Sequence, residues 1–470
     1  MSATTGPRAE GESAPTLRAG ALGLLEMVGQ SLAVVGPALT PALNITVVAG
    51  LAGIGCWMAY FIGTLGVVVV AACVGILAAR HPEAGAFFVY IGRTFWPFAG
   101  AMAGWSMVSA YLFTGVAVTL SYGIFLDDFF TALHVRLNPP TVFCAAVLFI
   151  TTVTYAAYRD VKLSARAGVA LQVISVGIIV VIMVLVVQVK GTVIDPAQLH
   201  VTSFKYGAIF SALPFVIFGF VGFESAATLA KESANPRRNI PLAVIGCGAF
   251  AGIFFTLSAY FMVFGMDNDT ATLGASTAPF GAVAARAGLG WASAVVYFAA
   301  MATAFACTLG SINAASRLLF SMGKYEFLHA SMGRVHDIHR TPHRAVVFCG
   351  GLISFICIVM LPAGLLTAFG LAATFAAFGF VVVYLMLCIV APMDLQRSGD
   401  MRLRHVALGV AGTALMLFVI VGSVYPVPEY PYNILPYVFF AYLAVGALWF
   451  SMLKAKSPQT LASIQHDMEG

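Results

Sequence analysis

One acidic residue stands inside a long apolar segment near the middle of the chain. Glu224 ends the run 218–224, which also contains Gly219 and Gly222. A carboxylate at the centre of a bilayer costs at least ~2.5–3.5 kcal/mol on insertion scales, so it faces the interior of a helix bundle and marks function. Because apolar surroundings disfavour the charged form, such a group can carry a proton near neutral pH. Glu224 is therefore predicted to contact a substrate amine, carry a proton or switch a gate. The alternative is an acid that caps a broken helix and holds its neighbours together.

A second interruption lies near the N-terminus. Gly36 is followed directly by Pro37, and Pro41 comes about one turn later. Proline lacks an N–H and clashes with the preceding turn of a helix, so this segment is predicted to unwind. Breaks at matching places in two halves indicate a transporter, since unwound N–H and C=O groups can hold a small polar solute. The alternative is two simple kinks. The predicted substrate contacts are Val34, Val35, Gly36 and Pro37 in the first break and Phe218, Gly219 and Gly222 in the second.

Phe218 is also predicted to act as a gate together with Glu224. Its ring stands beside the second break, where it can cover a bound solute by stacking or by a cation–π contact. Packing in the core is the alternative for Phe218 and the favoured interpretation for Tyr111. Glu26 lies near the predicted membrane boundary and is expected to be interfacial. The other acids are expected at span ends, in loops or in tails.

The composition requires a membrane environment for these breaks. Of the 470 residues, 60% are hydrophobic and only 9% are charged, whereas an average soluble domain is about 45–50% apolar and about 25% charged. A soluble enzyme, a disordered chain and a nucleic-acid binder are therefore excluded. The apolar runs are continuous rather than alternating with period two, which excludes a β-barrel. The sequence predicts an all-α polytopic membrane protein in contact with the lipid bilayer.

A membrane span needs ~20 mostly apolar residues. By this measure twelve transmembrane helices are predicted, over residues 21–48, 51–79, 98–126, 141–158, 167–189, 206–230, 240–265, 289–321, 345–361, 364–391, 405–424 and 434–453. Twelve crossings place both termini on one side. Of the 24 Lys and Arg residues, all but four fall on that side, the four being Arg136, Lys190, Lys205 and Arg286. Since Lys and Arg in short loops favour the cytoplasm, both termini are predicted to be cytoplasmic, in a plasma-membrane protein.

Enzyme chemistry and metal binding find little support in the sequence. The eight cysteines lie in apolar stretches without metal-ligand spacing and are read as buried side chains. His336, His339 and His343 form a loose cluster in a basic loop, for which solvated histidines are the favoured interpretation. No cofactor and no metal are predicted. Neutral polar groups in spans five and eight, among them Gln172, Ser175 and Thr303, could coordinate sodium but are also routine helix–helix contacts.

Three spaced motifs resemble the amino acid–polyamine–organocation transporters, a family with many bacterial amino acid permeases. They are residues 222–241, which begin Gly-Phe-Glu-Ser; residues 81–90, a glycine-containing loop; and residues 313–342, from Asn-Ala-Ala-Ser-Arg to Arg-Thr-Pro. The resemblance implies a leucine-transporter-like fold, in which spans one to five (18–190) and six to ten (191–404) are inverted repeats with broken helices 1 and 6. Spans eleven and twelve (405–453) would be peripheral, and residues 1–17 and 454–470 would be tails. By the same resemblance, Phe218 matches a gating aromatic and Glu224 a pH-sensitive glutamate.

The sequence departs from the family pattern in two places. Many members carry Gly-Ser-Gly in the first break, where this chain has Val34-Val35-Gly36 followed by Pro37. Recognition of an α-carboxylate by those N–H groups is therefore in doubt. Several proton-coupled members carry a lysine in span five, where this chain has Ser175. Coupling would then rest on Glu224, or the protein would exchange substrates without a proton.

The predicted function is secondary active transport of an amino acid or a related small amine by alternating access, as a monomer or homodimer. H⁺ coupling or exchange is possible. The alternatives are a polyamine or organic-amine exchanger and a transceptor or partner-dependent transport subunit. Uptake by the purified protein alone in liposomes separates the transceptor and the partner-dependent subunit from the predicted transporter.

Overall fold

The computed structural model describes residues 20–81, 87–159, 161–276, 279–286, 290, 292–425 and 427–456. Within these ranges the regular secondary structure is helical, apart from a single β-bridge between Leu22 and Ser233, and turns and loops connect the helices. The long and short α-helices are α1 (Leu24–Val35), α2 (Ile45–Ala52), α3 (Cys56–Arg80), α4 (Phe87–Thr94), α5 (Pro97–Ala132), α6 (Pro139–Arg159), α7 (Val161–Lys190), α8 (Pro196–Leu199), α9 (Tyr206–Phe220), α10 (Pro236–Gly265), α11 (Thr270–Ala275), α12 (Pro279–Arg286), α13 (Ala292–Lys324), α14 (His343–Met360), α15 (Leu365–Arg397), α16 (Leu403–Val424) and α17 (Leu435–Lys456). A π-helix, η1, covers Thr40–Asn44, and 3₁₀ helices cover η2 (Gly53–Gly55), η3 (Val201–Ser203), η4 (Ser225–Glu232), η5 (Ala330–Gly333), η6 (Leu361–Ala363) and η7 (Tyr432–Ile434).

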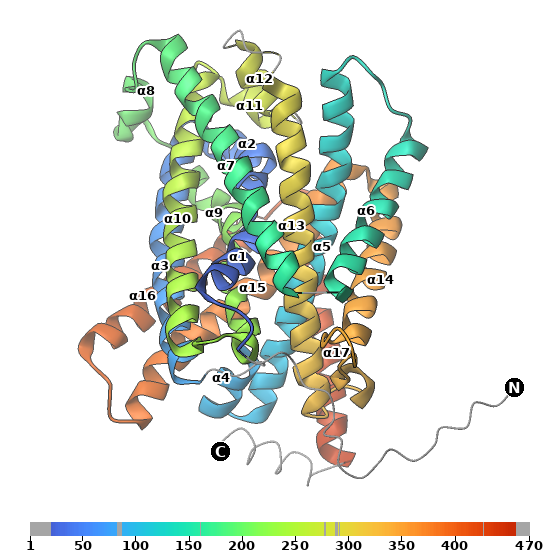
Figure 1. Ribbon diagram of the computed structural model, residues 1–470. Helices are drawn as coiled ribbons and strands as arrows, with labels where there is room; N and C mark the ends of the chain where they lie inside the picture. The colour runs from blue at the N-terminus through green and yellow to red at the C-terminus, as the bar shows by residue number, and fades with distance from the viewer. Residues whose placement is uncertain are drawn as a thin grey trace, which may run out of the picture.

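Eleven helical segments of the described chain are long and apolar enough to cross a membrane. The first of them, Leu24–Arg80, has 57 residues. At ~1.5 Å per residue this is nearly three times the ~30 Å thickness of the hydrocarbon layer. The chain turns within it at η2, where Gly53 has a left-handed φ of +60°. Figure 1 shows α2 near one end of the bundle and α3 running back toward the other. The segment is thus long enough for two crossings, and the count of twelve stays a prediction.

The core of the bundle consists of the helices that carry the breaks and those packed on them. Helix α5 is the most enclosed, with 89% of its most apolar stretch buried, whereas the figure is 17% for the segment that contains α17. Small residues permit this close packing. A Cβ added to Gly379 of α15 would lie 2.8 Å from the carbonyl oxygen of Ser106 on α5. Figure 1 shows α16 at the edge of the bundle, in keeping with the prediction that the last two spans are peripheral.

Main-chain hydrogen bonds join Leu22, which stands just before α1, to residues at the end of η4. The N–H of Leu22 donates to the carbonyl of Glu232 at 2.9 Å, and the N–H of Ala234 donates to the carbonyl of Leu22 at 2.8 Å. Directly beside these bonds, Arg317 of α13 donates to the Glu232 carboxylate at 2.7 Å. Both side chains are buried. The expectation that Glu232 lies in a loop is wrong, because its carboxylate is enclosed with a guanidinium partner.

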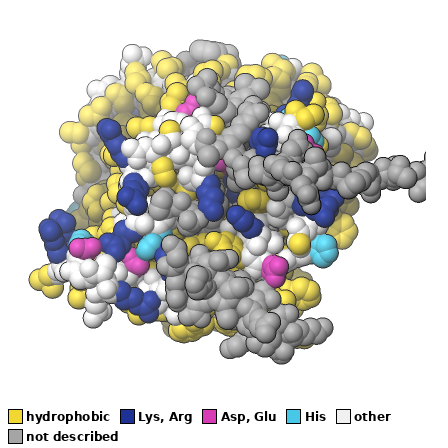
Figure 2. Space-filling model, turned by 60° about the horizontal axis from the view of Figure 1, so that its bottom comes forward, with side chains coloured by type: hydrophobic (Ala, Val, Ile, Leu, Met, Phe, Trp, Pro, Cys, Tyr) yellow, Lys and Arg dark blue, Asp and Glu magenta, His cyan; other side chains and the backbone are white. Residues whose placement is uncertain are grey.

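A second ion pair joins α3 to α15. Arg80 and His81 contact the two oxygens of Asp394 at 2.7 and 2.8 Å. Asp394 was also expected in a loop, and the structure instead places it in the last turns of α15, which runs beyond the apolar stretch to Arg397. The end of the bundle shown in Figure 2 carries many Lys and Arg side chains. Which face is cytoplasmic, and the division of the chain at residue 190, remain predictions, and the two predicted tails lie outside the described residues.

Candidate functional site

The first break lies between α1 and η1. Helix α1 ends at Val35, and Gly36 adopts a left-handed conformation with φ +57°. Such a φ suits glycine, which has no Cβ to clash with the following carbonyl. Pro37 and Ala38 form a turn closed by a hydrogen bond of 2.8 Å from the N–H of Leu39 to the carbonyl of Gly36. The chain therefore unwinds where Gly36 and Pro37 predict it.

The second break lies between α9 and η4. Helix α9 ends at Phe220, and Gly222 has a φ of +100°. The N–H of Val221 donates to the carbonyl of Phe218 at 3.2 Å, which closes the last turn of α9. The chain resumes as the 3₁₀ helix η4 at Ser225. Both halves of the segment are therefore helical, and the four residues between them are not.

The two breaks contact each other directly. A Cβ added to Gly222 would lie 2.2 Å from Val34 Cγ1, and one added to Gly219 would lie 2.9 Å from Thr40 Cγ2. Thr40 Oγ1 donates to the carbonyl of Gly219 at 3.2 Å. On the other side of the break, Ser31 Oγ donates to the carbonyl of Phe223 at 2.6 Å. The glycines thus allow the two interrupted segments to pack backbone to backbone.

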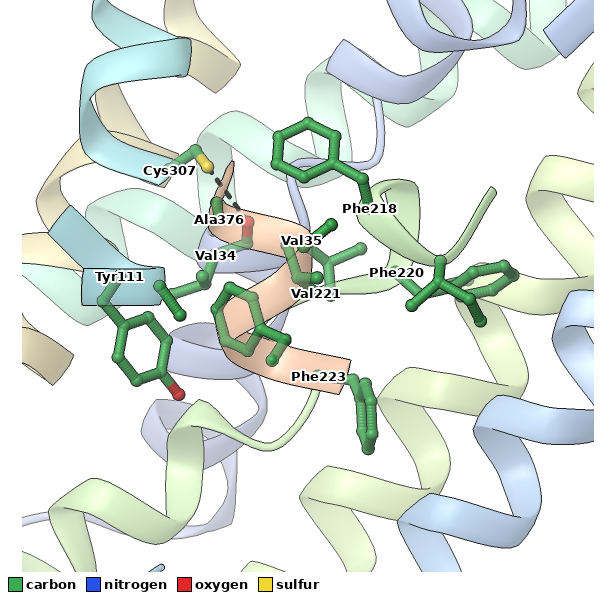
Figure 3. Packing of buried hydrophobic residues seen from close by; sticks show 14 of the residues in the cluster. Val34, Val35, Tyr111, Phe218, Phe220, Val221, Phe223, Cys307 and Ala376 are labelled. Atoms are coloured by element: carbon green, nitrogen blue, oxygen red, sulfur yellow. Dashed lines mark hydrogen bonds between the residues drawn. The ribbon is translucent and has the colours of Figure 1, made fainter. Parts of the chain in front are cut away.

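A small cavity lies where the breaks meet. Its volume is about 30 Å³, enough for a water molecule or two. Three of the seven predicted contacts line it, namely Val34, Val35 and Phe218. Gly36, Pro37 and Gly222 lie in the non-helical stretches beside it, and Gly219 lies in the last turn of α9. The remaining lining residues are Leu39, Thr40, Leu43, Asn44, Thr114, Val118, Ser121, Phe125, Val221, Cys307 and Phe369. Figure 3 shows Phe218 and Cys307 above Val34 and Val35.

The walls of this cavity are mostly apolar, and none of its lining residues carries a charge. Helices α1 and α9 end here, so their C-terminal, partially negative ends meet at the cavity. The N-terminal, partially positive end of η1 begins on the other side of the first break, where Thr40 also lines the cavity. A helix end is equivalent to roughly half an elementary charge. Ends of both signs around one cavity are complementary to a zwitterion.

Several polar groups around the breaks were not predicted from the sequence. Asn44 Nδ2 donates to the carbonyl of Phe215 at 2.7 Å and to the hydroxyl of Tyr60 at 3.1 Å. Cys307 Sγ donates to the carbonyl of Val34 at 3.0 Å, the bond drawn in Figure 3. Asn44 is an isolated amide in an apolar stretch, so its residue type was a usable signal. Cys307 gave none, because it resembles any small buried side chain.

Glu224 is completely buried beneath the second break. Its carboxylate accepts hydrogen bonds from Tyr111 of α5 at 2.6 Å, from Tyr384 of α15 at 2.5 Å and from the N–H of Gly222 at 3.1 Å. Glu224 does not line the cavity and instead joins the break to two other helices. In this conformation it crosslinks the break to α5 and α15, and its part in gating or proton transfer stays a prediction. Tyr111 was expected to be a core residue, and the role of Tyr384 was missed.

Gln172, Ser175 and Thr303 do not line the cavity, although Thr303 packs beside Gly36, where an added Cβ would lie 3.5 Å from Thr303 Cγ2. Ser175 Oγ donates to the carbonyls of Leu171 and Ala299. Within the described ranges, no three His, Cys, Asp or Glu side chains are arranged to hold a metal ion. The rings of His336, His339 and His343 pack around Tyr158. Of the glycine-containing motif, residues 82–86 lie outside the described residues, and Phe87–Thr94 forms α4.

The helix bundle with two touching interrupted segments is the architecture of a secondary transporter. This chain belongs to the amino acid permease family, whose family profile matches residues 30–456. It also resembles a solved structure of a Na⁺-coupled sialic acid symporter, with a TM-score of 0.55 and 14% identity over 87% of this chain and 92% of that one. The predicted leucine-transporter-like fold and the membership of the predicted superfamily are confirmed, and the protein is a multi-pass membrane protein.

Curated relatives include permeases for two kinds of substrate. The chain is 22% identical to a branched-chain amino acid permease of Bacillus subtilis, over 65% of this chain and 67% of the relative. It is 26% identical to the branched-chain amino acid permease of Lactococcus lactis, over 72% and 75%. It is 23% identical to a low-affinity putrescine importer of Escherichia coli, over 63% and 65%. The matches thus span about two thirds to three quarters of these proteins.

Proposed function

We propose that this secondary transporter moves a neutral, apolar amino acid across the plasma membrane by alternating access. The observation that carries the proposal is the cavity between the breaks, which has mostly apolar walls and helix ends of both signs. An ammonium group would be attracted to the C-terminal ends of α1 and α9, and a carboxylate to the N-terminal end of η1. The apolar side chains would contact the substrate side chain.

A polyamine is the second candidate, and the lining residues argue against it. Putrescine carries two positive charges and no carboxylate, so it would need anionic partners in a dry site. Glu224 is the nearest buried acid of the break, and its carboxylate already accepts three hydrogen bonds. Two of the relatives described above are branched-chain amino acid permeases and one is a putrescine importer. The apolar walls favour the first group.

The conformation described here is closed around the site. About 30 Å³ is too small for an amino acid, so binding requires the halves of α1–η1 or α9–η4 to separate. Phe218 and Phe369, whose ring centroids are 6.3 Å apart, cover one side of the cavity. Phe218 would act as a gate by moving away from Phe369.

Glu224 is proposed to link protonation to this movement. Its carboxylate holds Gly222, α5 and α15 together through three hydrogen bonds. A change in its protonation alters which of these bonds can form, because a carboxylic acid is also a donor. H⁺ coupling by this route does not need the lysine that Ser175 replaces.

The test is uptake by the purified protein in liposomes, with leucine, isoleucine, valine, phenylalanine, arginine, glutamate and putrescine as labelled substrates. We expect uptake of the apolar amino acids and none of putrescine. Transport of putrescine alone would overturn the substrate class. Uptake that appears only with a second chain present would favour the partner-dependent alternative.

A further inference from the structure

A second and much larger cavity lies apart from the breaks, on the lateral surface of the bundle. This lateral groove has a volume of about 770 Å³, within the range of small-molecule sites. Its walls are α5, α6, α14 and the first residues of α15. Figure 1 shows the upper part of α6 leaning away from α5, and the groove lies between them. None of its lining residues belongs to the cavity between the breaks.

The groove has the dimensions of one leaflet. On α5 the lining runs from Asp128 to Thr119, and on α6 from Pro139 to Ile150. At ~1.5 Å per residue these stretches cover about 14 and 16 Å along the helices. Half of a ~30 Å hydrocarbon layer is about 15 Å. The groove therefore extends from the ends of these helices to about the middle of the membrane.

The deep part of the groove is apolar, and its rim is acidic. Leu120, Ile124 and Ile150 are among its apolar walls. Asp127 and Asp128 stand at the end of the same α5 face. Asp128 Oδ2 is buried and accepts no hydrogen bond from the residues that the structure describes. A buried carboxylate oxygen without a donor is costly, so this rim is complementary to a group that donates hydrogen bonds and carries positive charge.

We propose that the lateral groove binds a membrane phospholipid whose headgroup carries a primary ammonium, with that ammonium at Asp127 and Asp128 and an acyl chain between α5, α6 and α14. A primary ammonium has three N–H donors, enough for both carboxylates. The exposed Arg136 precedes Leu137, a lining residue, so it stands at the same rim where the lipid phosphate would lie. A trimethylammonium headgroup has no N–H donor, and a glycerol headgroup has no positive charge.

Two substitutions separate the headgroup contact from the chain contact. Replacing both carboxylates (Asp127→Asn with Asp128→Asn) removes the charge and leaves the groove open. Ala146→Trp places a large ring in the groove from α6. The matched controls are Glu429→Gln, an exposed acid near η7, and Leu148→Trp, at a position of α6 that is 68% exposed and does not line the groove.

The experiment is native mass spectrometry of the detergent-purified protein titrated with phosphatidylethanolamine, phosphatidylcholine and phosphatidylglycerol of identical acyl chains. We expect the wild type to retain phosphatidylethanolamine at least about fivefold more tightly than the other two. The double Asn variant should lose this preference, and Ala146→Trp should bind all three lipids weakly, while both controls behave as wild type.

Equal affinity for the three lipids, or an unchanged preference in the double Asn variant, would overturn the proposal. Size-exclusion chromatography and the melting temperature show whether Ala146→Trp folds. If it does not, the double Asn variant and the comparison of headgroups still test the proposal. The measurement needs no transport, so its outcome is independent of the substrate proposed above.

Discussion

Gly222 presses against Val34 so closely that a Cβ on Gly222 would lie 2.2 Å from Val34 Cγ1 and 3.0 Å from the Val34 backbone carbon. The contact joins the two breaks beside the cavity that is proposed to hold the solute. It depends on a residue without a side chain, and on a φ of +100° that other residues rarely adopt.

Gly222→Ala is therefore expected to abolish transport and to lower the free energy of unfolding by about 1–3 kcal/mol, because the backbone becomes strained and Val34 must move. The matched control is Gly246→Ala on α10, where a Cβ would meet no atom within 4 Å. Thermal unfolding in detergent and uptake in liposomes measure the two effects. Wild-type transport by Gly222→Ala would show that the close contact is not needed.

Glu224→Gln is expected to change the pH dependence of transport. Glutamine keeps a hydrogen-bonding side chain of the same size between Tyr111 and Tyr384, but it does not titrate. The dependence of the uptake rate on pH should therefore flatten while the protein stays folded. Tyr384→Phe removes one hydrogen bond and keeps the titrating group, so it should retain a pH dependence. An unchanged profile at wild-type rate in Glu224→Gln would remove this residue from the mechanism.

Phe218→Ala is expected to raise the half-saturation concentration for substrate by about tenfold or more, since the ring covers the cavity and burying a phenylalanine is worth ~1.5–3 kcal/mol. Phe440→Ala on α17 is the control, because that ring is 65% exposed. The measurement is the concentration dependence of initial uptake. An equal change in both variants would point to a general effect on the fold.

Removing one partner of the buried pair of Arg317 and Glu232 is expected to lower the free energy of unfolding strongly. Replacing both partners by apolar residues is expected to lower it only slightly. Arg317→Met alone leaves a buried carboxylate without its guanidinium and should lower the free energy of unfolding by about 3–5 kcal/mol. Combining it with Glu232→Leu should recover most of that loss. The exposed pair of Lys190 and Asp267 is the comparison, and Lys190→Met should cost at most about 1 kcal/mol. Melting temperatures of these three variants and the wild type test this, and a double variant no more stable than Arg317→Met alone would contradict it.

The fold and the two breaks could be predicted from the sequence, because the residues that indicate them are neighbours in the chain. Continuous apolar runs predict spans, and Gly36 with Pro37 predicts an interruption regardless of what surrounds it. Helix ends were less accurate. Helix α5 continues to Ala132, six residues beyond the predicted span, because helical hydrogen bonding does not stop where the hydropathy falls.

The partners of the breaks are not local and could not be predicted in the same way. Tyr111 and Tyr384 lie 113 and 160 residues from Glu224 in the sequence. Tyrosines are frequent in this chain, so nothing in their spacing marks these two. The enclosure of Glu232 was missed for the same reason, since its partner Arg317 comes from another helix 85 residues away.

Two main-chain hydrogen bonds tie the residues just before α1 to the end of η4. The N–H of Leu22 donates to the carbonyl of Glu232, and the carbonyl of Leu22 accepts from the N–H of Ala234. We therefore expect α1 and η4 to move as a single unit when this end of the bundle opens, unless both bonds break first.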